Sequence, residues 1–210
     1  EIGAVCAHAE PANADENLLT RMQAAYYFMS FRILKAAESA FYTVFCCSGC
    51  SSAYRKSVIL PVLDEWLDER FLGLPVTWGD DRSLTSRVLQ PGFKTIYLDY
   101  VQAYTIVPNN WKQFLKQQIR WKKSWFVSSI FASRFIARRE PFVAFTYFFP
   151  LLLVTIATPL IAARALVYNP IVNGTAPTAY LLGVLLVATA FLIFYRHAAR
   201  QNRYWPYLFA

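Results

Sequence analysis

The stretch FVAFTYFFPLLLVTIATPLIAA, residues 142–163, contains no charged residue. Its length is close to the roughly twenty apolar residues that an α-helix needs to cross a hydrocarbon core of about 30 Å. Pro150 and Pro159 would kink such a helix without forbidding it. A second uncharged run covers residues 171–195. The sequence therefore predicts a transmembrane hairpin, followed by the start of a further membrane segment, over residues 141–210.

Basic residues flank this hairpin at its two outer ends. They are Arg134, Arg138 and Arg139 before the first run and Arg196, Arg200 and Arg203 after the second, whereas residues 167–179 contain none. Because cytoplasmic flanks carry the excess of Lys and Arg, we expect both flanks and the region before them in the cytoplasm. The predicted location is a plasma or inner cell membrane, which the chain crosses more than once.

The composition agrees with a membrane protein. The 210 residues carry a formal net charge of +8, and 56% of them are hydrophobic, a balance that is unusual for a soluble globular protein. The chain begins with Glu1 and ends inside an apolar stretch, so we expect a fragment that is inactive alone. Cys47 and Cys50 have the C-x-x-C spacing of zinc sites, but a second such pair is missing from the sequence. A zinc site is therefore not favoured.

Residues 1–110 mix helices and strands. Apolar periodicity and turn residues predict helices over 18–41, 57–72 and 81–89, and strands over 2–7, 42–47, 95–98 and 103–107. A small-residue turn, residues 48–52, follows the second of these strands. Gly49 in this turn has no Cβ, which allows the backbone to approach a ligand closely.

A basic helix is predicted over residues 111–126, within an amphipathic region that extends to residue 140. Its apolar stripe consists of Trp111, Leu115, Ile119 and Phe126, and Lys112, Lys116, Lys122 and Lys123 add positive charge. Such a helix beside a membrane segment is expected to lie in the lipid interface. Basic patches also bind nucleic acids, but the neighbouring membrane runs favour lipid.

Two carboxylates, Asp80 and Asp81, stand at the start of the helix predicted over residues 81–89. Acidic residues at this position commonly cap the helix and complement its dipole. One carboxylate suffices for that purpose. The other is free to project into a cleft, where the helix N-terminus would keep it ionised and able to accept a proton.

Gln117, Arg120, Trp121 and Ser124 are spaced to share one face of the basic helix. Arg offers forked donors to phosphate oxygens, Trp a flat surface for a sugar ring, and Gln a partner for hydroxyls. Snorkelling and an aromatic belt explain the neighbouring Trp125 and the lysines, but not this grouping.

Gly79-Asp80-Asp81-Arg82 and Gln117-Gln118-Ile119-Arg120-Trp121 resemble the G-D-D and Q-x-x-R-W signatures of processive family 2 glycosyltransferases of the hyaluronan and chitin synthase type. The resemblance covers essentially the whole chain. It implies that residues 1–110 are the C-terminal half of an α/β, GT-A-like cytoplasmic catalytic domain. An interfacial helix and transmembrane helices would follow.

The resemblance also implies the partners and the residue roles. Sugars, with N-acetylglucosamine preferred and glucuronate alternating in a hyaluronan synthase, would pass from UDP-sugars to a growing β-linked polysaccharide with inversion, and the polymer would be exported. Asp81, with Asp80 beside it, would be the catalytic acid pair, Asp81 being the general base. Substrate-binding positions would be Gln117, Arg120, Trp121, Arg82, Ser48 and Gly49.

Two departures from the family pattern concern Cys50, where many relatives have Pro, and Val107-Pro108-Asn109-Asn110, where an acidic residue is common. The residues that hold Mg²⁺ or Mn²⁺ in such enzymes would lie upstream of Glu1, so we expect no metal ligand in this fragment. Two alternatives remain. One is a non-processive transferase that acts on a lipid-linked acceptor, and the other is a membrane-anchored basic module that binds acidic lipids without catalysis. Nucleic acid is not an expected partner.

Overall fold

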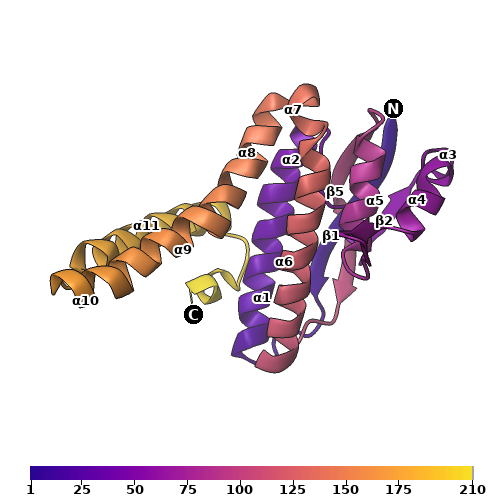
Figure 1. Ribbon diagram of the computed structural model, residues 1–210. Coiled ribbons are helices and arrows are strands. Elements are labelled where there is room, and N and C mark those ends of the chain that lie inside the picture. Colours follow the sequence, from indigo (N-terminus) through magenta and orange to yellow (C-terminus); the bar gives the residue numbers. More distant parts are fainter. Residues whose placement is uncertain (210) are drawn as a thin grey trace.

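The computed structural model describes residues 1–209, and Figure 1 shows an α/β region from which long helices project. A three-stranded sheet with the order β2-β1-β5 forms its centre. The middle strand β1 (Ile2–Pro11) is antiparallel to β2 (Ser52–Tyr54) and parallel to β5 (Lys94–Thr105). A second, two-stranded sheet pairs β3 (Arg70–Phe71) with β4 (Leu74–Pro75).

One continuous helix follows β1, as the periodicity predicts. It consists of α1 (Leu18–Phe28), a π-helical segment (Met29–Lys35) and α2 (Ala36–Ala40). Its start is fixed by a capping box in which the Asn17 side chain accepts from Thr20 N, while Asn17 N donates to Thr20 Oγ1. Such reciprocal caps satisfy amides that the first helical turn leaves unpaired.

The strand predicted over residues 42–47 is wrong. The segment has a single isolated β-bridge to the sheet, Thr43 to Thr95, and forms no ladder with it. The amides of Phe45 and Cys47 donate instead to the Glu38 carboxylate and to Thr85 Oγ1, at 3.2 and 3.0 Å. Side chains therefore take the place of the strand neighbour that the β-branched and aromatic residues led us to expect.

Two other boundaries also differ from prediction. The helix predicted over residues 57–72 divides into α3 (Lys56–Ile59), a 3₁₀ turn (Leu60–Val62) and α4 (Leu63–Leu67), and its last residues contain β3 of the β3–β4 hairpin. Leu72 and Gly73 make that hairpin turn at positive φ, 51° and 81°. The strands predicted over 95–98 and 103–107 form the single strand β5.

The remaining secondary-structure elements of the described chain are helical. They are α5 (Asp80–Leu89), α6 (Trp111–Ser133), α7 (Ile136–Arg139), α8 (Pro141–Leu152), α9 (Thr158–Ala163), α10 (Asn169–Asn173) and α11 (Thr178–Ala198), with π-helical segments at Leu153–Ala157 and Arg164–Tyr168 and a 3₁₀ turn at Trp205–Phe209. Pro141–Asn173 runs as one helix of 33 residues, and this helix and α11, with 21 residues, are long and apolar enough to cross a membrane. The chain is thus a mixed α/β region followed by two long apolar helices (Figure 1).

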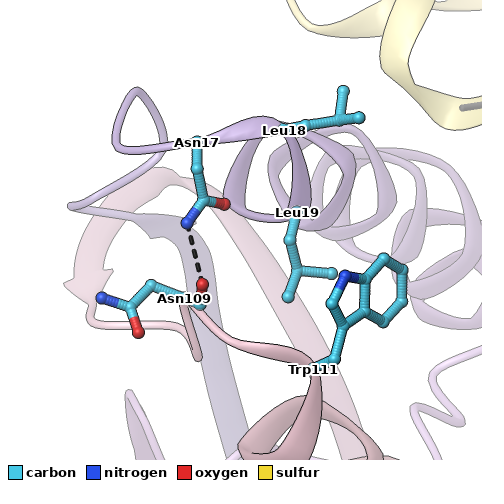
Figure 2. Close-up of a pocket in the computed structure, with 5 residues that line it drawn as sticks. All are labelled: Asn17, Leu18, Leu19, Asn109 and Trp111. Atoms are coloured by element: carbon cyan, nitrogen blue, oxygen red, sulfur yellow. Dashed lines mark hydrogen bonds between the residues drawn. The ribbon is translucent and has the colours of Figure 1, made fainter.

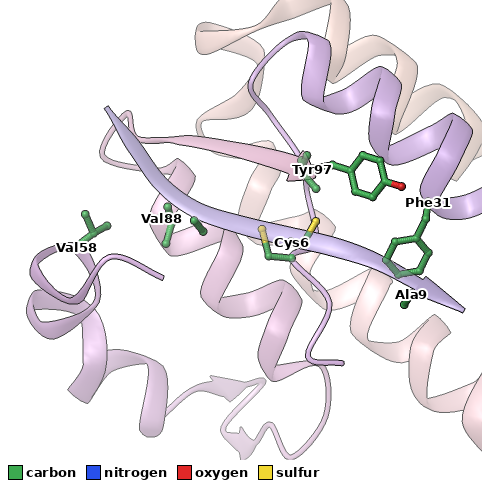
Figure 3. Close-up of a cluster of buried hydrophobic side chains, with 9 residues drawn as sticks. Cys6, Ala9, Phe31, Val58, Val88 and Tyr97 are labelled. Atoms are coloured by element: carbon green, nitrogen blue, oxygen red, sulfur yellow. The ribbon is translucent and has the colours of Figure 1, made fainter. Parts of the chain in front are cut away.

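Two hydrophobic clusters hold these parts together. The first, shown in Figure 3, packs the continuous helix and α5 on the sheet through residues such as Phe31, Val88 and Tyr97. The second joins the beginning of α8 to α5, α6 and α7. Its buried members are Phe45, Leu89, Ala132, Ile136, Val143 and Ala144. The first turns of α8 therefore pack on the α/β region.

Candidate functional site

The Asp81 carboxylate is held between two backbone amides. Gly49 N donates to its Oδ2 at 3.1 Å, and Arg82 N donates to its Oδ1 at 2.8 Å. Asp81 lies in the first turn of α5, where the partial positive charge of the helix N-terminus stabilises an anion. Two of the sequence-predicted positions, Asp81 and Gly49, are thus brought together across 32 residues of chain.

Thr85 and Tyr54 connect the segment that contains Cys47 and Gly49 to α5. The Thr85 hydroxyl donates to the Asp81 carbonyl at 2.6 Å and accepts from Cys47 N at 3.0 Å. The Tyr54 hydroxyl donates to the Cys47 carbonyl at 3.1 Å, and burial raises the pKa of Tyr54. Sequence reasoning assigned no role to either residue, because a single Thr inside a helix gives no signal of a distant partner.

Asp80 has different surroundings. It is exposed, and its carbonyl accepts from Trp66 Nε1 at 3.2 Å. Within residues 1–209 its carboxylate makes no hydrogen bond or ion pair. The two adjacent carboxylates are therefore distinguishable, and Asp81 is the one that the fold orients.

Arg82 turns toward the interior. Its Nη1 donates to the Tyr147 hydroxyl of α8 at 3.3 Å. Burial by itself would lower the pKa of Arg82, but the nearby Cys46, Tyr147, Glu38 and Asp81 groups raise it overall. Arg82 is accordingly a half-buried cation next to Asp81, and it is linked to the start of the first long apolar helix.

Ser48 is bound to a residue that the sequence did not mark. Lys35 Nζ donates to Ser48 Oγ at 2.5 Å and to the Cys46 carbonyl at 2.6 Å. Lys35 is buried, ends the π-helical segment and lies 4.3 Å from the centroid of the Phe31 ring. Insertions of this kind in helices are frequent at functional sites, and this one places a cation behind the 48–49 turn.

The predicted Gln-Arg-Trp face lies on α6, with fewer polar partners. Arg120 is exposed, and the Trp121 ring lies 6.4 Å from the Tyr27 ring of α1. Gln117 Oε1 is buried and finds no hydrogen-bond partner among residues 1–209. Trp78, just before α5, has an equally unpaired Nε1 within the same described residues, and Lys123 Nζ lies 5.5 Å from its ring centroid.

Gly79 joins the two parts of the site. It caps α5 with φ of 82°, and a Cβ at this position would lie 1.9 Å from Ser124 Oγ of α6. A side chain is excluded both by the space and by the left-handed backbone. The glycine therefore lets the carboxylate turn rest directly on the helix that carries Gln117 and Trp121.

Comparison with known proteins gives a family match over part of the chain. Residues 1–67 match the family described as chitin synthase. The similarity to this family is thus to the first part of the chain, from β1 to α4.

Further relatives extend the similarity. An N-acetylglucosaminyltransferase of Rhizobium meliloti is 34% identical over 145 residues, which are 69% of this chain and 34% of the relative. A hyaluronan synthase of Streptococcus pyogenes serotype M1 is 40% identical over 141 residues, 67% of this chain and 33% of the relative. The chain is thus related to family 2 glycosyltransferases and spans about one third of the length of these relatives.

The described residues were also compared with the needs of a metal site. Residues 1–209 contain no group of three or more His, Cys, Asp or Glu side chains that could hold a metal ion. Cys6, Cys46, Cys47 and Cys50 are free thiols. A separate shallow pocket, shown in Figure 2, is lined by Asn17, Leu18, Leu19, Asn109 and Trp111 and shares no residue with the Asp81 turn.

Proposed function

We propose that this chain is part of a membrane-embedded, processive family 2 glycosyltransferase. It would transfer sugars from UDP-sugars to a growing β-linked polysaccharide with inversion and export the product. The observation that carries the proposal is the Asp81 carboxylate, oriented by two amides at 2.8 and 3.1 Å on a helix N-terminus that rests on the Gln-Arg-Trp helix. The names of the relatives favour N-acetylglucosamine as a donor sugar, with glucuronate alternating in a hyaluronan-type product.

In this proposal Asp81 is the general base. Its carboxylate takes the proton of an acceptor hydroxyl, whose oxygen attacks the anomeric carbon while the bond to UDP breaks. Arg120 would contact the diphosphate, Trp121 would stack on the acceptor sugar, and Gln117 Oε1 would accept from one of its hydroxyls. Mg²⁺ or Mn²⁺, bound by residues upstream of this fragment, would neutralise charge on the leaving diphosphate. Asp80 would stand beside the base, Arg82 would bind substrate, and Ser48 and Gly49 would line the acceptor side.

The proposed domains follow from the same roles. Residues 1–110 would form the C-terminal half of a cytoplasmic GT-A catalytic domain. Residues 111–140 would be amphipathic helices in the lipid interface, and residues 141–210 would be a transmembrane hairpin with the start of a further segment. The location would be a plasma or inner cell membrane.

A second function is favoured by one observation on α6. Trp111, Leu115, Ile119 and Phe126 are all exposed, between 50% and 58%, on a helix that also carries four lysines. An exposed apolar stripe with basic flanks suits an anionic lipid surface. Lipid binding without catalysis would survive Asp81→Asn and weaken with salt.

The test uses the full-length protein in membranes, supplied with individual and paired UDP-sugars. UDP release and product size are measured for wild type, Asp81→Asn and the exposed control Asp64→Asn. We expect long polymer and UDP release from wild type and from Asp64→Asn, and a loss of about 10²- to 10⁴-fold in Asp81→Asn, the usual contribution of a general base. Single-sugar products would favour the non-processive alternative, and full turnover by Asp81→Asn would refute the assignment of the base.

A further inference from the structure

Tyr147 is the residue through which helix α8 reaches the Asp81 turn. Its ring is stacked on the ring of Phe45, with centroids 4.0 Å apart and 28° between the planes. Its hydroxyl accepts from Arg82 Nη1 at 3.3 Å and lies 3.0 Å from Ser129 Oγ of α6. In the sequence this tyrosine stands inside an uncharged run, where it resembles an ordinary lipid-facing or interfacial residue.

Both backbone amides that bind the Asp81 carboxylate lie in segments that Tyr147 contacts. The first amide belongs to Arg82, whose guanidinium donates to the Tyr147 hydroxyl. The second belongs to Gly49, in the turn that follows Phe45, the residue on which the Tyr147 ring is stacked.

Glu38 also holds the segment around Phe45. Its carboxylate accepts from Phe45 N at 3.2 Å, and burial raises its pKa. Glu38 and Asp81 are both close enough to Arg82 to affect the pKa of its guanidinium. Arg82 is thus a half-buried cation that both acids influence, and the Tyr147 hydroxyl is the neutral acceptor for its guanidinium.

We propose that Tyr147 is a positioning residue for the transfer reaction and acts on Asp81 through Arg82 and Phe45. The inference rests on the proposed function of Asp81. A general base must stay within hydrogen-bond reach of the proton that it abstracts, and a misplacement of about 1 Å can cost about 10²-fold in rate. Through Tyr147, a helix that continues toward the bilayer sets the direction of the carboxylate.

The packing of α8 would let a movement of this helix reach the Asp81 carboxylate through Tyr147. Val143 and Ala144, one turn before Tyr147, are buried in the cluster that contains Phe45 and Leu89. The first turns of α8 therefore move with α5 and with the turn after Phe45. A change in the tilt of the helix would reach Arg82 and Phe45 together, because one side chain touches both.

The test compares Tyr147→Phe with Tyr168→Phe in the full-length protein in membranes. Tyr147→Phe keeps the ring and loses only the hydroxyl, whereas Tyr168 is an exposed tyrosine further along the same long helix. We expect Tyr147→Phe to lower kcat about tenfold, normalised to folded protein, with the donor KM unchanged. Tyr168→Phe should match wild type. Wild-type kcat in Tyr147→Phe would overturn the inference.

Three further variants locate the coupling: Arg82→Gln, its double variant with Tyr147→Phe, and Ser129→Ala. If Tyr147 acts through Arg82, the double variant Tyr147→Phe with Arg82→Gln should be no slower than Arg82→Gln alone, and Ser129→Ala should keep most of the activity. A Ser129→Ala variant as slow as Tyr147→Phe would show instead that the hydroxyl serves only the packing of α8 on α6. If Tyr147→Phe fails to accumulate, Arg82→Lys replaces it, with the same expected fall in kcat and the same overturning result.

The outcome is separable from that of the proposed function. If Asp81→Asn keeps full turnover, the assignment of the base is wrong whatever Tyr147 does. If Asp81→Asn is inactive and Tyr147→Phe equals wild type, only the positioning role of Tyr147 is wrong.

Discussion

The carboxylate turn and the Gln-Arg-Trp face differ in how completely their polar groups are paired. Around Asp81 the amides of Gly49, Arg82 and Cys47 each have a partner between 2.8 and 3.1 Å. On the α6 side, Gln117 Oε1 and Trp78 Nε1 are buried without a partner among residues 1–209. An unpaired buried polar atom costs about 1–3 kcal/mol. The first region is therefore paired within residues 1–209, whereas in the second Gln117 Oε1 can still accept and Trp78 Nε1 can still donate a hydrogen bond.

The largest expected effect concerns the two carboxylates. Asp81 and Asp80 are adjacent, but only the Asp81 carboxylate is oriented by amides among the residues described. We expect Asp81→Asn to lower kcat by about 10²- to 10⁴-fold, and Asp80→Asn to lower it by less than about tenfold. UDP release at saturating substrate measures both. An equal loss in the two variants would remove the distinction on which the comparison rests.

The next effect concerns Gly79, where the two regions touch. Gly79→Ala would place a Cβ 1.9 Å from Ser124 Oγ at a φ of 82°, so we expect a loss of about 3 kcal/mol from overpacking and backbone strain together. Gly73→Ala is the matched control, because Gly73 has φ of 81° and no atom within 4 Å of an added Cβ. Thermal unfolding of the purified protein in detergent should show the larger fall in Tm for Gly79→Ala. Equal falls in Tm would mean that the backbone conformation alone destabilises both variants and that the added Cβ does not clash with Ser124.

A smaller effect is expected at Thr85, inside the paired region. Thr85→Val keeps the shape but leaves the buried Cys47 amide without its acceptor, at a cost of about 1–3 kcal/mol. We expect a lower Tm and a fall of a few fold in kcat, because the turn that contacts Asp81 loosens. Thr189→Val, at an exposed Thr of α11, is the control. Wild-type stability in Thr85→Val would mean that water replaces the hydroxyl at Cys47.

The sequence predicts what local pattern determines. The continuous helix from Leu18, the start of α5 and the shared face on α6 all follow from periodicity and capping. The partnerships that complete the Asp81 turn do not, because Lys35, Thr85 and Tyr147 join it from segments whose local patterns show only a helix or an apolar run. The strand predicted over residues 42–47 is wrong for the same reason. Two of its amides donate to Glu38 and Thr85, and the residue pattern of the segment does not predict those acceptors.

The smallest expected effect tests the unpaired region directly. If the Gln-Arg-Trp face receives the acceptor sugar, Trp121→Ala should raise the acceptor KM about tenfold and leave kcat nearly unchanged, which is the signature of binding shared by ground state and transition state. Trp111→Ala is the matched control, since Trp111 belongs to the same helix but lies exposed at its first turn. A fall in kcat at constant KM would instead place Trp121 with the carboxylate turn. In that case the Trp121 ring, which lies 6.4 Å from the Tyr27 ring, would support the structure of the reacting centre. Gln117 and Trp78 would then form their hydrogen bonds with another part of the full-length protein.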